Sequence, residues 1–432
     1  MSAEYCKRER DTIMKEFKNY YQLITETEYM LDNYLPLGLI SNLKFYLKNE
    51  IKKLLKRGYN KKDAINWPAG LLLKGLTDAV EYLESEEFNA FTNSATDDAY
   101  IDKDSSNEVA NQIVTHIEAY LAPYLNKLSN NGNGDKIIGD AVSGDSKSLK
   151  IDVLDDAITA ETFLWMYERT SKAEYKYAAD AVFSYLMKHK KDLKGSLIYR
   201  PVQGNSFILA DMVGMVCPFL AKYGIMFSST EALDLCEKQL VNFINYGFDT
   251  YSKLPYHGYE LVSDEVNNCS YVNYGIIGWG RAVGWILRGE SYYLKAILDN
   301  NIVNVSDDYI KIKANFNELC STVMKYKKSN MFSWQVQATN GPIDMSGTSM
   351  IWDSILEVKN IDFGGESRND IKDGMDSTET EINSSVWNYI KEGKVTNTLA
   401  ECLGFSMHPQ IYGSYPWGQG VTLSMISKLR AI

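Results

Sequence analysis

One carboxylate, Asp211, lies alone in an apolar run, where its chemistry differs from that of a surface acid. It is the only charged residue among the fifteen residues 207–221, FILADMVGMVCPFLA. Burial disfavours the ionised form of Asp and raises its pKa, so such a residue can act as a proton donor. The alternative is a helix cap, because an Asp side chain can accept the free amide hydrogens of a first turn. Asp211 alone does not decide between these roles.

Two adjacent acids, Asp155 and Asp156, form a second candidate site in the segment 154–157, LDDA. They stand at the start of a predicted helix, and the helix dipole favours acids there, so a structural role alone also explains them. If one of them lies close to Asp211, the two carboxyl groups titrate as a coupled pair and one stays protonated.

A third cluster combines a histidine with an arginine between two tryptophans. His257 lies in the segment 254–260, LPYHGYE, and Trp279, Arg281 and Trp285 lie in the segment 279–285, WGRAVGW. An arginine beside indole rings can hold a carboxylate while a ring stacks on a sugar. Core packing is the alternative for the two tryptophans. Three glycines among residues 278–284 call for a packing or site reason, because glycine disfavours helices.

The composition supports a large core and argues against several partners. Apolar residues make up 45% of the 432 residues, and the 30 Tyr and 8 Trp leave aromatic side chains for a sugar-binding surface. The formal net charge of −11 argues against binding to nucleic acid or to an anionic membrane surface. An acidic substrate therefore needs a local cationic clamp.

The cysteines and histidines show no pattern typical of a metal site. The chain has six Cys and four His, with no Cys-x-x-Cys pair and no metal-ligand spacing, so we predict no metal and no cofactor. The N-terminal residues lack an apolar signal segment, and no uninterrupted apolar run reaches the about 18 residues that span a bilayer. We expect reduced, mostly structural thiols and a cytoplasmic protein.

Helical periodicity recurs along the chain, and strand-like alternation is scarce. The predicted helices cover residues 8–33, 40–57, 68–88, 106–128, 152–170, 173–190, 207–224, 229–246, 277–298, 307–327, 345–358, 378–392 and 418–430. Twelve helices from about Asn42 onward fit six helical hairpins in two concentric rings. We therefore predict an all-α fold, an (α/α)6 toroid with an extra N-terminal helix.

The predicted toroid has one catalytic domain with its site at one mouth. We expect residues 1–40 to form an N-terminal helical extension and residues 41–432 a single (α/α)6 catalytic domain. Residues 92–107, 129–148 and 364–378 are predicted to be polar surface loops, because they are rich in Gly, Ser, Asn and charged residues.

These residues, in their order and spacing, resemble the unsaturated uronyl hydrolases of glycoside hydrolase families 88 and 105, most closely the unsaturated rhamnogalacturonyl hydrolases of the second. The resemblance covers most of the chain from about Asn66. It is carried by five motifs: Asn66-Trp67-Pro68-Ala69-Gly70, the helix around Asp211, and the segments Gly278–Trp285, Ser346–Met350 and Tyr412–Gly420. Five motifs in the family's order argue against chance.

The resemblance implies an enzyme that removes a 4,5-unsaturated uronic acid from the non-reducing end of lyase-generated oligosaccharides. A carboxylic acid protonates C4 of the enol ether, water adds at C5, and the resulting hemiketal opens to release the remaining sugar chain. The resemblance assigns Asp211 as the acid/base and Asp156 as a supporting carboxylate. Asp156 is preferred to Asp155 only because of its spacing to Asp211.

The resemblance also implies a set of substrate-binding residues, namely His257, Trp279, Arg281, Trp285, Arg200, Trp67 and Trp417. His257 is expected to hydrogen-bond the substrate or the attacking water, and Arg281 to hold the uronate carboxylate. Trp279 and Trp285 are expected to form an apolar wall. Arg200 stands where the family usually carries a histidine, so it could bind another anionic group.

Other interpretations stay open from the sequence. An inverting glycosidase needs two carboxylates about 6.5–9.5 Å apart, and a sugar epimerase needs paired histidines at the inner mouth, where only His257 is expected. A non-catalytic carbohydrate-binding protein has no need for both acids together with the histidine and the Arg-Trp cluster. The expected partner is an unsaturated uronate-containing oligosaccharide. The source polysaccharide, the leaving sugar, the role of the insertion 92–148 and the oligomeric state are left undetermined.

Overall fold

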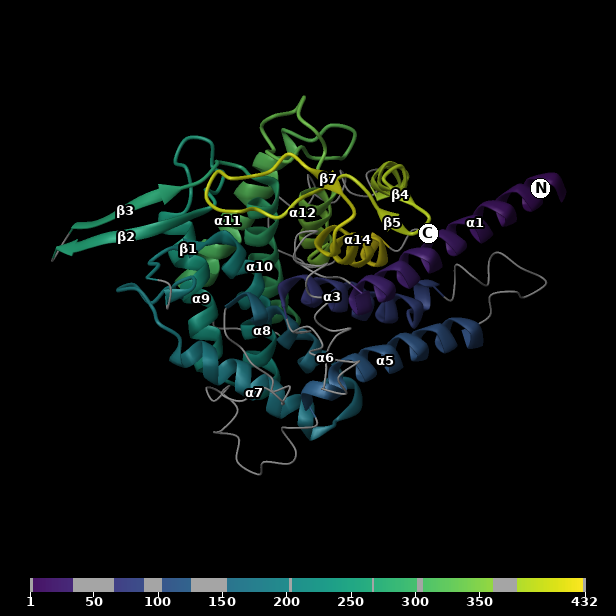
Figure 1. Cartoon of the computed structure of the whole chain (residues 1–432), viewed down its shortest axis with the longest axis horizontal. Coiled ribbons are helices and arrows are strands. Elements are labelled where there is room, and N and C mark those ends of the chain that lie inside the picture. Colours follow the sequence, from purple (N-terminus) through teal and green to yellow (C-terminus); the bar gives the residue numbers. More distant parts are fainter. Residues whose placement is uncertain are drawn as a thin grey trace, which may run out of the picture.

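In its computed structural model (Figure 1), the chain folds into two concentric rings of helices, an arrangement that the contacts between the helices define. The structure describes residues 3–33, 66–88, 103–125, 154–201, 204–265, 268–300, 306–359 and 379–429. The short strands and the loops between the rings carry most of the candidate site.

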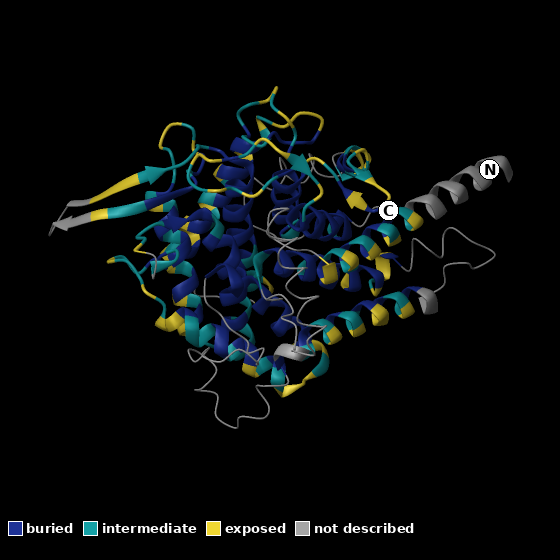
Figure 2. Ribbon diagram, in the orientation of Figure 1, coloured by how far each residue is buried: buried dark blue, intermediate teal, exposed yellow. Residues whose placement is uncertain are grey.

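Among the described residues, six helices form the inner ring, and they are buried on nearly all faces (Figure 2). They are α3 (Trp67–Leu83), α6 (Ala160–Thr170) with the preceding 3-10 turn η2 (Leu154–Thr159), α8 (Ala210–Phe227), α10 (Gly280–Asp299), α12 (Met345–Glu357) and α14 (Pro416–Leu429). Each contacts the next in this order, and α14 contacts α3, so the ring is closed. Thirteen of the fourteen residues of α14 are buried, as expected for a helix that is apolar all round.

The outer helices have the amphipathic pattern of elements that cover a core. α5 (Lys103–Leu125) packs on α3, α7 (Ala173–Lys188) on α6, α9 (Thr230–Tyr246) on α8, and α11 (Asp307–Met324) on α9 and α10. In α9 the buried residues Leu235, Gln239 and Phe243 recur every four positions along one face. Local signals set the helix starts, because Ser229 caps α9 and Asn66 caps α3 through their side chains.

The N-terminal helix α1 (Ala3–Asn33) packs on α3 and α14. Gln419 of α14 donates its Nε2 hydrogens to the carbonyl oxygen of Leu23 at 3.3 Å and to Oγ1 of Thr27 at 3.2 Å. The hydroxyls of Tyr20 and Ser427 lie 2.7 Å apart. The predicted N-terminal helix is therefore joined to the ring by buried polar contacts.

Short antiparallel strands connect the helices at one mouth. β1 (Ile208–Leu209), β2 (Gly258–Glu265) and β3 (Asn268–Tyr274) form a three-stranded sheet in that order, in which Leu209 pairs with Gly258. The β2–β3 hairpin projects away from the helices (Figure 1). β4 (Ile390–Lys391) pairs with β5 (Lys394–Val395), and β6 (Thr398–Leu399) pairs with β7 (Tyr412–Gly413). The helical pattern of the sequence had not predicted the hairpin.

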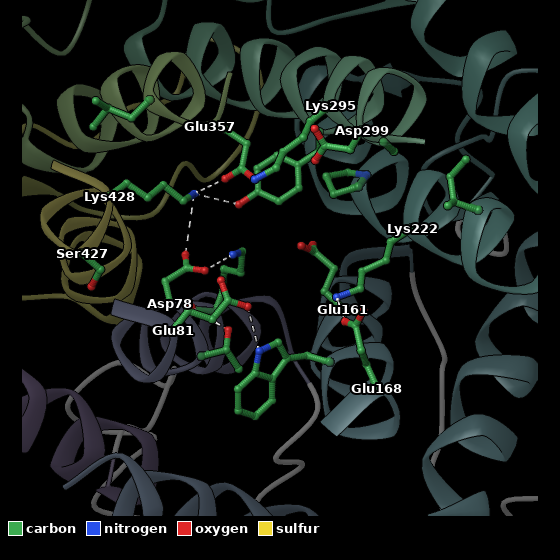
Figure 3. A pocket seen from close by; sticks show the side chains of 18 of the residues that line it. Asp78, Glu81, Glu161, Glu168, Lys222, Lys295, Asp299, Glu357, Ser427 and Lys428 are labelled. Atoms are coloured by element: carbon green, nitrogen blue, oxygen red, sulfur yellow. Dashed lines mark hydrogen bonds and ion pairs between the residues drawn. The ribbon is translucent and has the colours of Figure 1, made fainter. Parts of the chain in front are cut away.

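At the opposite mouth, residues from all six inner helices surround a cavity of about 790 Å³ that is rich in charged side chains (Figure 3). Nζ of Lys428 lies 2.7 Å from Oδ1 of Asp353, 2.5 Å from Oε2 of Glu357 and 3.6 Å from Oδ2 of Asp78. Burial disfavours the charged lysine, yet these carboxylates raise the pKa of Lys428 well above its ordinary value. A buried network of this kind is stable only while every charge keeps its partner.

A second buried ion pair joins three inner helices. Nη2 of Arg288 on α10 donates to both carboxylate oxygens of Glu161 on α6, at 2.8 and 2.7 Å. Its Nη1 donates to the carbonyl oxygen of Gly214 on α8 at 2.5 Å. This bidentate contact fixes the positions of the helices from which the acids of the site project.

The predicted (α/α)6 toroid is confirmed, with helices where the periodicity placed them in most of the described ranges. The predicted helix 378–392 was too long, because its helical part ends at residue 387 and residues 390–391 form β4. Residues 103–107 of the predicted loop 92–107 instead begin α5, because a polar first helical turn resembles a loop in composition. The predicted helix 40–57, the boundary at residues 40/41 and the loops 129–148 and 364–378 lie outside the described residues. α8 is long and apolar enough to cross a membrane by length and composition, but 72% of it is buried inside the ring.

Candidate active site

Asp211 and His257 face one another at the mouth where α8 begins. Asp211 lies in the first turn of α8, and its Oδ2 is 3.2 Å from Nε2 of His257. The Asp211 side chain is 18% exposed and the His257 side chain 6% exposed. Leu209 occupies the N-cap position, so helix capping does not account for the carboxylate. The two groups form an acid–imidazole pair in which Asp211 is the more exposed member.

The backbone around His257 places its ring beside the start of α8. The amide of Ala210 donates to the carbonyl oxygen of His257 at 2.9 Å, next to the pairing of β1 with β2. Gly275 has φ of +87°, and a Cβ there would lie 2.5 Å from Cβ of His257. A larger residue at position 275 would displace the imidazole, so the glycine is required for this close approach.

His257 is protonated at neutral pH through its neighbours. Burial lowers the pKa of His257, but the hydrogen-bonding groups of Asp211 and Cys402 outweigh burial and raise this pKa to about 9. Sγ of Cys402 lies 4.0 Å from Nδ1, on the opposite side of the ring from Asp211. An acid and an imidazole that share a proton can both donate one to a substrate and accept one from water.

Asp155 and Arg200 form a second pair at this mouth. Nη2 of Arg200 donates to Oδ2 of Asp155 at 3.0 Å, and the two side chains are 35% and 8% exposed. Burial raises the pKa of Asp155, Arg200 opposes the rise, and the negative charge of Asp211 adds to it. Asp155 is therefore close enough to Asp211 for the negative charge of Asp211 to disfavour the ionisation of Asp155.

Asp156, which the sequence spacing had favoured, is also buried in η2, and its negative charge contributes to the raised pKa of Arg200. In a 3-10 turn, successive side chains point about 120° apart, so the two neighbouring acids have different surroundings. The structure places Asp155 in the hydrogen bond with Arg200 and in the field of Asp211. Sequence spacing to Asp211 does not distinguish two adjacent acids.

Tyr199, Arg200 and Glu401 complete the polar group around these acids. Burial, followed by the charge of Asp155, raises the pKa of Tyr199. Burial also raises the pKa of Glu401, and Arg281 and Arg200 oppose that rise. Arg200 has a left-handed φ of 46°, and its buried Nε has no hydrogen-bond partner among the described residues. The Arg200 side chain as a whole is 35% exposed, so part of it is open to a ligand.

Arg281 is held by the protein on several sides. Its Nη1 donates to the carbonyl oxygen of Leu399 at 2.9 Å and to Oγ of Ser346 at 3.2 Å, and its Nη2 donates to the carbonyl oxygen of Ala400 at 2.8 Å. Oδ2 of Asp344 is 3.8 Å away, and Arg281 is only 2% exposed. The guanidinium therefore fixes the chain at residues 399–400, a role different from the carboxylate-binding role that the sequence implied.

Trp279 borders the acid–imidazole pair. Its ring centroid is 4.7 Å from that of His257 and 4.7 Å from that of His408. Phe405 contacts His257 edge-on at 5.2 Å. The buried Nε1 of Trp279 has no hydrogen-bond partner among the described residues. Trp279 thus lies beside the histidine, whereas the sequence had predicted only that it forms an apolar wall with Trp285.

The other predicted tryptophans lie apart from this pair. Trp285 is buried between α8 and α10, where a Cβ on Gly214 would meet its ring at 2.5 Å, so Trp285 belongs to the helix packing. The rings of Trp67 and Trp417 lie 5.0 Å apart, centroid to centroid, at the starts of α3 and α14, and they are tilted by 34° to one another. Tyr415 stacks on Trp417 at 4.8 Å with an interplanar angle of 3°. These rings form an aromatic platform at the mouth.

The loop between β6 and β7, residues 400–411, is the part of the site that sequence reasoning missed. It brings Cys402 to His257 across 145 residues of sequence. It also places His408 6.0 Å from His257, centroid to centroid, so the expectation that His257 alone occupies the mouth was wrong. Burial and the positive charges of His257 and Arg281 lower the pKa of His408 to about 4, which keeps its ring neutral.

The toroid, with paired carboxylates beside a histidine and aromatic rings at one mouth, defines a carbohydrate-active enzyme. The sequence profile of Glycosyl Hydrolase Family 88 matches residues 42–428, and the chain belongs to this family. It is therefore a glycoside hydrolase. No curated protein matches the chain by sequence.

Several solved structures share the fold. A glycoside hydrolase of family 105 from C. acetobutylicum is 15% identical, with a TM-score of 0.61 over 90% of this chain and 99% of that chain. A possible family 105 member from Salmonella enterica is 13% identical, with a TM-score of 0.63 over 98% and 94%. The unsaturated glucuronyl hydrolase of Bacillus sp. GL1 is 14% identical, with a TM-score of 0.60 over 94% and 96%. At these identities the likeness concerns the fold alone.

Proposed function

We propose that this enzyme hydrates the C4=C5 enol ether of a 4,5-unsaturated uronic acid at the non-reducing end of rhamnogalacturonan-derived oligosaccharides. The observation that carries the proposal is the Asp211–His257 pair, with 3.2 Å between Oδ2 and Nε2, at the mouth of a family 88 toroid. The order of motifs along the chain, which resembles family 105 more than family 88, supports rhamnogalacturonan as the source.

The reaction uses the proton that the pair holds. Asp211 delivers a proton to C4, and positive charge develops at C5 and the ring oxygen. Water then adds at C5 and returns a proton to the Asp211 carboxylate, which His257 keeps in position at 3.2 Å. The C5 hemiketal opens, the remaining sugar chain leaves with its hydroxyl, and a keto-uronate is formed. The net change is the addition of one water, and the enzyme is unchanged.

Asp155 is assigned as the second carboxylate, in place of Asp156. It is buried, it lies in the field of Asp211, and it is oriented by the 3.0 Å hydrogen bond from Arg200. A carboxylate fixed in this way stabilises positive charge at C5 more strongly than solvent would, because it needs no reorganisation.

Arg200 is assigned as the cation that holds the uronate carboxylate. A protein with a net charge of −11 needs a local cation for an acidic sugar, and the guanidinium of Arg281 is already occupied by two backbone carbonyls. Arg200 is 35% exposed, and its Nε is free among the described residues. A planar guanidinium suits a carboxylate because it can donate two hydrogen bonds at once.

The decay of ultraviolet absorbance from the conjugated C4=C5 carboxylate tests the reaction and the substrate. Lyase-generated disaccharides from rhamnogalacturonan, glycosaminoglycan and other uronate polymers are compared. We expect decay with the rhamnogalacturonan disaccharide. Decay only with glycosaminoglycan products would overturn the assigned source, and no decay with any substrate would overturn the reaction.

The role of Arg200 has its own test. Arg200→Gln is expected to raise KM about 10-fold or more, since a buried charge-assisted hydrogen bond to a ligand is worth about 1.5–3 kcal/mol. Arg169→Gln, which removes an arginine paired with Glu84 away from the mouth, is the control and is expected to leave KM unchanged. An unchanged KM in Arg200→Gln would show that another group holds the carboxylate.

A further inference from the structure

Two side chains that the proposed reaction leaves unused gather on the far side of His257. One possible ligand atom from each of His257, Cys402 and His408 lies within 4.8 Å of the others. The first residue comes from the turn before β2, and the other two come from the loop 400–411 between β6 and β7. This cluster forms only in the folded chain, so the linear spacing of the cysteines and histidines gave no sign of it.

His408 is the independent sign that a ligand belongs here. It is only 9% exposed, and neither of its ring nitrogens has a hydrogen-bond partner among the described residues. A buried imidazole without a partner loses its hydrogen bonds to water and gains nothing in return. A cation that accepts a nitrogen lone pair would satisfy this ring, which is aimed at the neighbouring histidine and cysteine.

His257 already has the orientation of a metal-binding histidine. Its Nε2 faces the Asp211 carboxylate at 3.2 Å, and its Nδ1 faces Sγ of Cys402 at 4.0 Å. Histidines that bind metals usually donate their other ring N–H to a carboxylate, which fixes the tautomer and leaves the second nitrogen free. The pair at the mouth thus supplies the outer contact that such a ligand needs.

The distances and the atom types fit a zinc-class ion. With Zn–S of about 2.3 Å and Zn–N of about 2.0–2.1 Å, a tetrahedral site separates sulfur from nitrogen by about 3.6 Å. The observed 4.0 Å between Cys402 Sγ and His257 Nδ1 requires a closure of only a few tenths of an ångström. The widest separation in the cluster, up to 4.8 Å, requires a closure of about 1 Å. Two imidazoles and a thiolate favour Zn²⁺ over Mg²⁺ and Ca²⁺, which prefer oxygen ligands.

We propose that Nδ1 of His257, Sγ of Cys402 and a ring nitrogen of His408 bind one Zn²⁺-class ion that fastens the loop 400–411 to the mouth. Binding releases two protons to solvent, the thiol proton of Cys402 and the Nδ1 proton of His257, and the hydrogen bond from Sγ to the carbonyl oxygen of Gly404 is lost. The fourth position is left for water. The proposal does not depend on the assigned reaction, because the ligands and their arrangement are read from the fold alone.

Cobalt(II) is the probe for this site in the full chain. We expect one equivalent of Co²⁺ to bind with thiolate-to-cobalt charge-transfer absorption, and Zn²⁺ to displace it. Cys402→Ser is expected to abolish this absorption, and His408→Gln to weaken binding at least 10-fold. His116→Gln is the control, since that histidine lies between Glu28 and Asp32 on the outer helices. Charge-transfer absorption that persists in Cys402→Ser would overturn the proposal.

A measurement on the unaltered protein covers the case in which a variant does not fold. Cys402 is partly exposed, so iodoacetamide can reach its thiol. We expect Zn²⁺ to slow alkylation of Cys402 at least 10-fold, read by peptide mass spectrometry, while Mg²⁺ has no effect. Alkylation of Cys402 at the same rate with and without Zn²⁺ would overturn the proposal.

Discussion

Replacing Arg281 with lysine is expected to destabilise the protein more than it weakens substrate binding. The guanidinium donates to the carbonyl oxygens of Leu399 and Ala400 and to Ser346, at 2.9, 2.8 and 3.2 Å. A lysine keeps the charge, but one ammonium on a flexible stem does not reproduce the planar fork that reaches both carbonyls. Loss of two charge-assisted hydrogen bonds at about 1.5 kcal/mol each lowers the free energy of unfolding by about 3 kcal/mol.

The expected change in melting temperature follows from the size of the chain. At about 2.1 cal/mol/K per residue, 432 residues have an unfolding entropy of about 0.9 kcal/mol/K, so Tm falls by about 3 °C. Calorimetry measures Tm, and steady-state kinetics measure KM. Arg169→Lys at the surface pair with Glu84 is the control, with an expected change below about 1 °C. An unchanged Tm with a large rise in KM would refute this reasoning and assign Arg281 to the substrate.

Three further predictions concern other charged groups. Asp155→Asn is expected to lower kcat by about 10²-fold or more, and Asp156→Asn by much less. Equal losses of kcat in the two variants would contradict the assignment of Asp155 as the second carboxylate. Lys428→Met leaves the buried Asp353 carboxylate without a cation and leaves Glu357 paired with Lys295 alone, so urea denaturation should show a loss of about 3–5 kcal/mol; a loss below about 1 kcal/mol would argue against the network. Glu28 is the main cause that raises the pKa of His116 to about 9, so the stabilisation is full below about pH 6.5 and is lost as the pH rises through 9. His116→Gln should therefore lower Tm most below about pH 6.5, and the difference in Tm should disappear as the pH rises through 9. A difference in Tm that is independent of pH would contradict this prediction.

The fold could be predicted because the helices of its two rings have different and regular patterns of apolar residues. Inner helices such as α8 are apolar nearly all round, and outer helices such as α9 repeat buried residues every three or four positions. The β2–β3 hairpin was missed because it projects away from the helices (Figure 1) and shows no continuous buried face among the residues whose burial is described. Val262 and Val272 on it are 59% and 43% exposed, so the alternation that marks a half-buried strand is absent.

The site could be predicted only where a single residue departs from its surroundings. Asp211 was visible as one charge in an apolar run, and the structure gives it a partner in His257. An arginine beside tryptophans has the same sequence pattern whether it holds a substrate or a loop, so the contacts of Arg281 could not be predicted. Cys402 and His408 reach His257 from more than a hundred residues away, and no local pattern reports such a contact.

The central claim is that Asp211 is the proton donor, and the most direct test compares Asp211→Asn with the unaltered enzyme. The assay is the loss of absorbance of the unsaturated rhamnogalacturonan disaccharide. We predict a fall in kcat of about 10²–10⁴-fold, with KM nearly unchanged. Asp234→Asn, at an exposed acid on the outer helix α9, is the control that should retain full activity. Near-normal turnover in Asp211→Asn would contradict the account.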